Sequence, residues 1–517
     1  MGNAILAGLA QRRSRWFWCS AHNAELLAVL ALTLLYIALM SAHLQSIDGI
    51  LMFNQTRAMV FDGSFQFSQP IGGDRLMTSP HPIGLSLLYL PGFVVWSVVQ
   101  PFVPVDIRYP DDWSSPAGDP LYAIIGAPIH ILIAAATAYL VARFGQELGL
   151  SRHASLWGVA FYGLGSPAIV YAREDWSQPL TGLCVIAALY AALRFRRTRR
   201  LTALATCGGI LMFAVLTRPL ESVFLALAVT LLVAPHLRPW RWSAAAWRTV
   251  GVLVVSVAIG AAITVLVNRA RIDSGGSGGI APGYEGEGWS TPLWVGLPGA
   301  LISPGRGILW SFPAVLLVPL GFRRLWPTSN RVVGVAFGLV TGLMLLSTAT
   351  WYAWWGGWSW GLRLFIPALP LLAVLAACGV AALPHAKRRW LPGLLIVGGL
   401  VWATPCIVTY IEAGYSAAHS GSTVDQYRWD AYPPIGAWQY LDRWRAETLD
   451  DQRSVDIIWW RVAHRSHNLS LALPVLLVLG ALLVAGRVRS LLADPPGSAV
   501  RVRGPATARR GDAPLSP

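Results

Sequence analysis

Long apolar runs constrain this chain more than any other feature of its sequence. A run of roughly 20 residues can cross the hydrocarbon core of a bilayer as a helix. The chain is 55% hydrophobic and only 13% charged, about half the charged fraction of average soluble domains. This composition excludes a set of soluble domains and excludes intrinsic disorder. We expect an all-α, polytopic integral membrane protein whose spans lie near residues 24–44, 121–142, 153–171, 178–194, 201–217, 219–235, 249–267, 308–322, 332–350, 364–383, 391–411 and 469–486.

One further apolar run, residues 83–103, is punctuated by prolines. Each proline removes a backbone donor that lipid cannot replace. If this run crossed fully, the arginine-rich loops at 194–200, 323–324 and 387–389 would fall outside, against the preference for such loops in the cytoplasm. We therefore expect 83–103 to be re-entrant or interfacial. The fold then has about 12 to 13 transmembrane helices and exterior amphipathic helices, and both termini are cytoplasmic.

The net charge of +15 raises the question of a nucleic-acid partner. On the expected topology, cytoplasmic segments hold 25 of the 40 Lys and Arg residues but only four of the 25 acids. The exterior holds the other 15 arginines and 21 acids. The basic excess is therefore a topology signal, and no nucleic-acid partner is expected.

Three exterior segments are too long for simple turns, and long loops with their own character tend to be functional. They are 45–82, 268–307 and 412–468. Cytoplasmic loops are short and no GxxxxGK[ST] motif is present, which argues against an ATP-driven pump. The expected organisation is a catalytic transmembrane module over 1–411, an exterior subdomain over 412–468, a last transmembrane helix over 469–489 and a disordered cytoplasmic tail over 490–517.

Ionisable side chains gather at the outer ends of the early apolar runs. Asp48 lies in the first exterior loop, where a carboxylate can deprotonate a hydroxyl. His81 precedes the proline-punctuated run. Arg173, Glu174 and Asp175 share one exterior turn, and three charges between apolar runs are costly unless they are paired or hydrated. A helix cap for Asp48 and a local ion pair in the later turn are the structural interpretations. Convergence on one exterior cavity is the functional interpretation.

Later exterior turns add cations and aromatic side chains. Arg218, Arg306 and Arg363 stand at outer ends of apolar runs, and arginine can grip a phosphate bidentately. Arg363 closes the stretch WYAWWGGWSWGLR, which carries five tryptophans in ten residues, Trp358 among them. An interfacial aromatic belt would explain some of them. Because the cluster is denser than a belt needs, we expect Trp358 to contact substrate.

The order of these features resembles the GT-C glycosyltransferases, in particular the protein O-mannosyltransferase and aminoarabinose-transferase branch. The resemblance covers residues 24–200 best: one helix, an acidic residue in the first exterior loop, HPIGL in place of a His/Lys-Pro-Pro-Leu element, a helix ending at LGLS, and an exterior turn, YARED, with arginine and aspartate. HPIGL lacks the second proline, and Asp48 is followed by Gly49 where the mannosyltransferases carry Asp-Glu. Beyond residue 200, SPGRG and GGWSWGLR resemble members of the same superfamily in style.

The resemblance implies an inverting transfer of a sugar from a polyprenyl-phosphate donor at the outer face of the cytoplasmic membrane. Asp48 would take the proton from an acceptor hydroxyl, and the sugar would pass through an oxocarbenium-like state. Asp175 would orient the acceptor or Asp48, or join in holding a divalent metal. His81 and Glu174 would bind substrate, and the departing phosphate would be stabilised by an arginine, at 173, 218, 306 or 363.

The sugar is a hexose or a pentose, and the acceptor is a glycan, a lipid or a protein of the cell envelope. No ATP is needed, because the donor carries its own leaving group.

Two other functions share some of these features. A transporter or flippase for lipid-linked substrates would carry ionisable residues at mid-bilayer depth, whereas most charges here lie at the ends of segments. A ligase using a diphosphate-linked glycan donor would share the large exterior loop and the arginine-rich site. A non-catalytic scaffold is disfavoured, because a scaffold has no need of acids and arginines at every outer turn.

Overall fold

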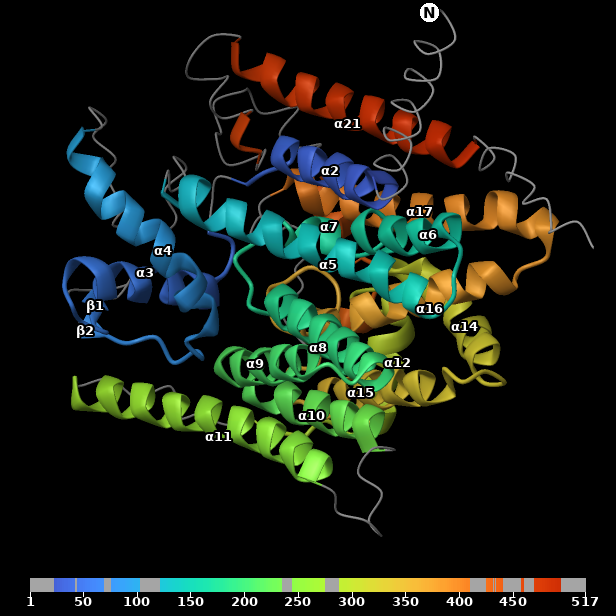
Figure 1. Cartoon of the computed structure of the whole chain (residues 1–517). Coiled ribbons are helices and arrows are strands. Elements are labelled where there is room, and N and C mark those ends of the chain that lie inside the picture. The colour runs from blue at the N-terminus through green and yellow to red at the C-terminus, as the bar shows by residue number, and fades with distance from the viewer. Residues whose placement is uncertain are drawn as a thin grey trace, which may run out of the picture.

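Helices make up most of the part of the chain that the structure describes, and most of the long ones run in the same general direction (Figure 1). The computed structural model describes residues 23–41, 44–68, 76–102, 121–234, 244–274, 288–409, 425–430, 432, 434–439, 457–459 and 469–493. Residues 1–22 and 275–287, most of the expected 412–468 subdomain and the tail beyond 493 lie outside these residues.

The first half of the chain supplies the helices that carry the early motifs. They and the small hairpin between them are α2 (Asn23–Ala38), α3 (Ile47–Phe61), β1 (Phe67–Ser68), β2 (Leu76–Met77), α4 (Gly84–Val99) with a 3₁₀ turn η1 (Gln100–Phe102), a π-helical turn η2 (Tyr122–Gly126), α5 (Ala127–Glu147), α6 (Arg152–Gly163), α7 (Ala168–Tyr171), α8 (Gln178–Thr198), α9 (Leu201–Thr217), α10 (Pro219–Val233) and α11 (Ala244–Asp273). The two short strands pair antiparallel, with Phe67 opposite Met77.

The second half contributes the centre of the bundle and its last helix. Its elements are α12 (Leu293–Ile302), α13 (Ile308–Ser311), η4 (Pro313–Leu317), α14 (Val318–Leu325), α15 (Arg331–Thr350), η5 (Arg363–Ala368), α16 (Leu369–Ala382), α17 (His385–Val408), η6 (Asp425–Tyr427) and α21 (Leu469–Ala493). α21 lies beside α2, so the last described helix packs on the first (Figure 1).

α16 forms the core of the bundle. Its residues 369–380 are all buried, as expected for a helix that is apolar on every side. Two glycines allow its neighbours to approach closely. A β-carbon at Gly321 would lie 2.1 Å from the carbonyl oxygen of Leu375, and one at Gly379 would lie 2.3 Å from that of Leu317. Small residues at such contacts are how helices pack within a membrane.

The all-helical, multi-pass membrane fold predicted from the sequence is confirmed. Eight described helices are long and apolar enough to cross a membrane, and four more apolar helices are shorter. The number is below the expected 12 to 13 because two expected spans are broken and three others, α2, α9 and α10, form shorter helices, while residues 84–102 add one. Residues 153–171 divide into α6 and α7 at a Leu-Gly-Ser-Pro stretch, and residues 308–322 divide into α13, η4 and α14 at Phe312–Pro313.

The run expected to be re-entrant or interfacial, residues 83–103, forms a continuous helix over most of its length. α4 continues through Pro91, and residues 84–102 are among the eight helices that could span. One lost backbone hydrogen bond does not end the helix, because the turns on both sides of the proline keep their own bonds. α4 lies beside α3 at one side of the molecule (Figure 1).

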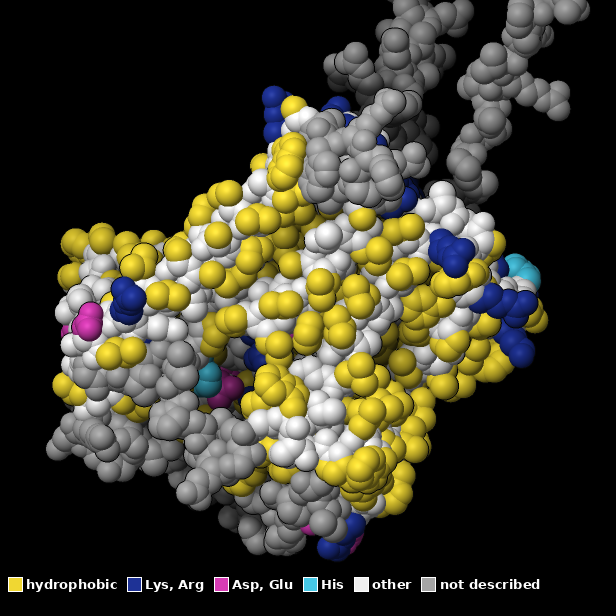
Figure 2. Space-filling view, turned by 90° about the horizontal axis from the view of Figure 1, so that it is seen from below, with side chains coloured by type: hydrophobic (Ala, Val, Ile, Leu, Met, Phe, Trp, Pro, Cys, Tyr) yellow, Lys and Arg dark blue, Asp and Glu magenta, His cyan; other side chains and the backbone are white. Residues whose placement is uncertain are grey.

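The bundle has two chemically different ends. At one end, here called the arginine-rich end, three turns between helices are tied together. Arg194 and Arg197 pair with Glu147, Arg197 also donates to the side chain of Asn330, and Asn330 donates to the carbonyl oxygen of Leu148. Figure 2 shows Lys and Arg side chains gathered at one edge of an otherwise largely hydrophobic surface. The other end, here called the α3 end, carries α3, the hairpin and the last turns of α9 and α11.

Candidate functional site

Asp48 lies in the first turn of α3 and does not cap it. Ser46 is the N-cap, and its hydroxyl accepts a hydrogen bond from the backbone N–H of Gly49 at 2.9 Å. Because the cap is supplied by serine, the carboxylate of Asp48 is available for other partners. Its side chain is about one quarter exposed.

Two cationic or protonatable side chains from distant parts of the chain contact Asp48. Nη1 of Arg363 lies 3.1 Å from Oδ2 of Asp48, and Nε2 of His81 lies 3.5 Å from Oδ1. Arg363 begins η5 after the tryptophan-rich stretch, and His81 stands just before α4. Both are partly exposed. A hollow on one face of the molecule has a histidine and acidic side chains in its floor (Figure 2).

The surrounding charges keep Asp48 ionised. Burial raises the pKa of this carboxyl, but the positive charges of His81, Arg363 and Arg218 more than offset it, so the pKa lies below its ordinary value. Burial lowers the pKa of His81, and although Asp48 raises it, Arg363, Arg218 and Arg271 lower it further. His81 is therefore uncharged at neutral pH, and the ionised state of Asp48 depends there on Arg363 and Arg218.

Asp175 is completely buried behind the start of α3. Its Oδ1 accepts hydrogen bonds from the backbone N–H groups of Gln45 at 3.0 Å and Ser46 at 3.1 Å. A carboxylate at a helix N-terminus is also favoured by the helix dipole. Burial raises the pKa of Asp175 to about 7, although the hydrogen bonds from Gln45 and Ser46 act to lower it. The carboxylate thus holds the turn that carries Asp48.

Gly49 is in contact with this carboxylate. A β-carbon at position 49 would lie 1.8 Å from Oδ2 of Asp175 and 2.2 Å from its Cγ. A side chain at position 49 would therefore displace the carboxylate of Asp175.

Arg173 and Glu174 are turned into the protein. Arg173 is 2% exposed and donates through Nη1 to the carbonyl oxygen of Ile407 in α17. Glu174 is 1% exposed and accepts from the indole N–H of Trp176 at 2.8 Å. The guanidinium of Arg363 lies 4.0 Å above the Trp176 ring, a cation–π contact. Trp176 therefore packs against the guanidinium of Arg363.

Arg306 has a structural position that the sequence did not indicate. Its guanidinium is 1% exposed and donates to the side chain of Gln426 and to the carbonyl oxygens of Gly357, Ser359 and Gly361. These bonds use four of the five donors of the side chain. Arg306 therefore holds the tryptophan-rich stretch in place.

The tryptophan-rich stretch divides into core and surface positions. Trp354 and Trp360 are fully buried, whereas Trp358 is half exposed. Gly357 has a φ of +67°, in the left-handed region that favours glycine. Trp358 is thus the member of the cluster best placed to meet a ligand, and part of the cluster serves packing.

Arg218 and Arg271 complete the positive surroundings of the site. Arg218 follows α9 and pairs with Glu221. The start of α4 packs on the end of α9, since a β-carbon at Gly84 would lie 2.3 Å from the hydroxyl of Thr217. Arg218 therefore lies near His81.

Arg271 was not anticipated. It lies near the end of α11, is 1% exposed and donates through Nη1 to the side chain of Asn268 at 3.4 Å, while its Nε and Nη2 have no hydrogen-bond partner among the described residues. The end of α11 contacts the α3 end, because the side-chain amide of Gln66 donates to the carbonyl oxygen of Ser274. The sequence offers Arg269 and Arg271 alike, and only burial distinguishes them.

The resemblance allows for a divalent metal, and the residues that the structure describes were compared with what such a site requires. No three His, Cys, Asp or Glu side chains gather there as a metal site would require. Asp175 is bonded to backbone N–H groups and Asp48 to Arg363, so the two carboxylates do not form a joint ligand set.

No protein-family model and no curated protein matches the sequence. Among solved structures, the chain is similar to the GT-C glycosyltransferase ArnT from Cupriavidus metallidurans in the apo state, with a TM-score of 0.48 and 13% identity over 90% of this chain and 76% of that one. It is also similar to an oligosaccharyltransferase from Archaeoglobus fulgidus (TM-score 0.43, 12% identity, 83% and 58% covered) and to the arabinosyltransferase EmbB from Mycobacterium smegmatis (0.43, 13%, 90% and 41%). The structural resemblance to GT-C glycosyltransferases expected from the sequence is present over most of the chain.

Proposed function

We propose that this chain is a membrane glycosyltransferase that moves a sugar from a polyprenyl-phosphate donor to an acceptor hydroxyl, with inversion at the anomeric carbon. The observation that carries the proposal is the contact between Asp48 and Arg363 with His81 beside it. A carboxylate that is ionised and partly exposed can accept a proton. The arginines around it can bind an anion.

The proposed reaction uses these groups in fixed roles. Asp48 takes the proton of the acceptor hydroxyl as its oxygen bonds to the anomeric carbon. The bond between that carbon and the donor phosphate oxygen breaks, and polyprenyl phosphate leaves with the electron pair. Negative charge grows on the leaving phosphate, where preorganised cations are most effective. No other co-reactant is needed.

Arg271 and Arg218, two arginines whose charges act on His81, are the proposed phosphate ligands. Arg271 offers two guanidinium donors without a partner among the described residues, and Arg218 contributes charge nearby. His81, being uncharged at neutral pH, can donate a hydrogen bond without repelling these arginines. ArnT has been solved with undecaprenyl phosphate bound, and our assignment of a polyprenyl-phosphate donor to this chain rests on its own cations.

Asp175 acts in this proposal as a positioning residue. It touches the turn that carries Asp48 and is completely buried, so it serves neither donor nor acceptor directly. Trp358 is half exposed and precedes Arg363 in the tryptophan-rich stretch. It is the proposed sugar or acceptor contact, since aromatic faces stack on sugar rings. We propose that the site faces the exterior of the cytoplasmic membrane, because the opposite end of the bundle is rich in arginine.

The test is transfer by Asp48→Asn in membranes supplied with a labelled polyprenyl-phosphate sugar. Loss of a general base is expected to slow transfer about 10²- to 10⁴-fold. Near-normal transfer by this variant would contradict the assignment of Asp48 as the general base.

Parallel assays with the native chain separate the competing functions. Transfer from a diphosphate-linked donor but not from a monophosphate-linked donor would indicate a ligase. Movement of the labelled lipid across proteoliposomes with no new glycosidic bond would indicate a transporter.

A further inference from the structure

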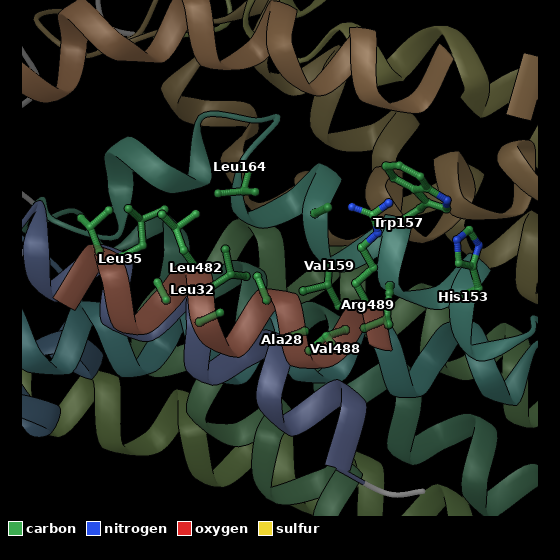
Figure 3. A pocket seen from close by; sticks show the side chains of 16 residues that line it. Ala28, Leu32, Leu35, His153, Trp157, Val159, Leu164, Leu482, Val488 and Arg489 are labelled. Atoms are coloured by element: carbon green, nitrogen blue, oxygen red, sulfur yellow. The ribbon is translucent and has the colours of Figure 1, made fainter. Parts of the chain in front are cut away.

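A groove lies on the flank of the bundle between α2, α6 and α21 (Figure 3). Its volume is about 560 Å³, within the range of roughly 300–1,000 Å³ typical of sites for small molecules. Of its 16 lining residues, 14 are hydrophobic, and the other two are His153 and Arg489. This lining suits an amphiphilic ligand, because the groove is apolar along its length and has very few polar groups.

The two polar residues lie together at one end of the groove. Figure 3 shows Arg489 and His153 close to Trp157, with Leu35 toward the other end. This is the arginine-rich end of the bundle. Near it, Glu25 in the first turn of α2 accepts a hydrogen bond from Gln146 at the end of α5.

The basic end of the groove is far from the candidate transferase site. α2 has 16 residues, which corresponds to about 24 Å at 1.5 Å per residue. Asp48 lies beyond the last residue of α2, whereas Glu25 is near the first. A phosphate at Arg489 therefore cannot be the phosphate that leaves near Arg271.

We propose that this groove binds an anionic phospholipid, with an acyl chain along the apolar walls and the headgroup phosphate at Arg489 and His153. Charge complementarity selects this occupant. Basic pockets between membrane helices on the cytoplasmic side bind anionic headgroups. A zwitterionic phospholipid would gain the same apolar contacts but less from the arginine. The proposal does not depend on the transferase function.

Two pairs of matched variants test the groove. Leu482 lines the groove, and Leu482→Trp narrows it, whereas the neighbouring Leu483 does not line it, so Leu483→Trp is the control. Arg489→Gln removes the proposed headgroup contact. Its control is Arg487→Gln, because residues two apart point about 200° away from each other around a helix.

The experiment uses the purified full-length chain in mild detergent, stripped of lipid and titrated with phosphatidylglycerol or phosphatidylcholine. Bound lipid is counted by native mass spectrometry. We expect one phosphatidylglycerol per chain and weaker binding of phosphatidylcholine. Arg489→Gln should weaken phosphatidylglycerol binding about fivefold, and Leu482→Trp should abolish it, while both controls bind as the native chain does.

Other outcomes would overturn the proposal. Equal binding of the two lipids, or equal losses in Arg489→Gln and Arg487→Gln, would contradict the proposed contact between Arg489 and the headgroup. Full binding by Leu482→Trp would show that the lipid lies elsewhere. A photoactivatable phosphatidylglycerol that labels neither α6 nor α21, or chemical cross-links from one of the chain's own terminal segments into the groove, would assign the groove to another occupant. An unchanged melting temperature verifies that each variant is folded.

Discussion

The α-carbon of Gly49 lies so close to the carboxylate of Asp175 that a β-carbon at position 49 would lie 1.8 Å from Oδ2. Asp175 cannot move away without losing its hydrogen bonds to the N–H groups of Gln45 and Ser46. Gly49→Ala should therefore displace the first turn of α3 and Asp48 with it. A displacement of about 1 Å can reduce a rate about 100-fold, so we expect a loss of that order in sugar transfer.

The control for this substitution is Gly342→Ala in α15. A β-carbon there would meet no heavy atom within 4 Å, and alanine is favoured in helices. Transfer by this variant should equal that of the native chain. Native activity in Gly49→Ala would mean that the packing of Gly49 on Asp175 is not needed to position Asp48.

Removal of the Arg363 charge should shift the pH dependence of transfer. Burial raises the pKa of Asp48 and Arg363 helps to lower it, so Arg363→Gln should raise the pKa of Asp48. The acid limb of the kcat/KM profile should then move to higher pH. Arg363→Lys retains a positive charge and should shift the limb less. An unchanged acid limb in Arg363→Gln would show that Asp48 is not the group that titrates.

Asp175 should make the stability of the protein fall as the pH rises toward neutral. Burial raises its pKa in the folded state to about 7, while an unfolded aspartate titrates near 3.9. Between these two pKa values the folded state therefore binds more protons than the unfolded state. The contribution of Asp175 to the free energy of unfolding is greatest below about pH 4 and is lost as the pH rises through about 7. Asp175→Asn removes this contribution. The melting temperature of the native chain, relative to that of Asp175→Asn, should fall from pH 5 to pH 7.5; a constant difference would contradict the prediction.

Arg271 should contribute to donor binding. Its buried guanidinium has unpartnered Nε and Nη2 donors among the described residues, and a hydrogen bond to a charged group contributes about 1.5–3 kcal/mol. Arg271→Gln should therefore raise the KM for a polyprenyl-phosphate sugar about 10-fold or more, with a smaller change in kcat. Arg269→Gln changes an exposed arginine two residues earlier and should leave both constants unchanged. Equal effects in the two variants would exclude a specific role for Arg271.

Arg306 should affect stability more than any surface arginine. Arg306→Ala leaves three backbone carbonyls and the side chain of Gln426 without their donor, and each buried acceptor left unpaired costs about 1–3 kcal/mol. We expect a clear fall in melting temperature. Arg331→Ala removes only an exposed side chain stacked on Trp326, worth about 0.5–1 kcal/mol, and is the control.

The sequence predicted the fold class and named part of the candidate site. Apolar runs of spanning length identified most helices, because the bilayer imposes a minimum length on each. The breaks between α6 and α7 and around Phe312 were missed, because hydropathy does not report where a chain leaves the helix within the protein. Asp48, His81 and Arg363 could be named because each is a charged or protonatable residue at the end of an apolar run.

The sequence could not distinguish exposed arginines from buried ones. Arg306 and Arg363 both stand at outer ends of apolar runs, yet Arg306 is bonded to backbone carbonyls and Arg363 to Asp48. Which role an arginine takes depends on the acceptors that the fold brings to it, and those come from segments far away in sequence. The same reason explains why Arg271 was overlooked and why Asp175 turned out to hold a backbone turn.

The pairing of Asp48 with Arg363 also bears on the biosynthesis of the protein. The two residues are separated by 315 positions in the chain. A ribosome that has inserted the first helix and α3 must still make eight further helices, α4 to α11, and then α12 to α15, before Arg363 emerges. Until then Arg363 cannot pair with Asp48, so an incomplete chain in the membrane lacks the assembled candidate site. The proposed transferase site is therefore completed only late in the synthesis of the chain.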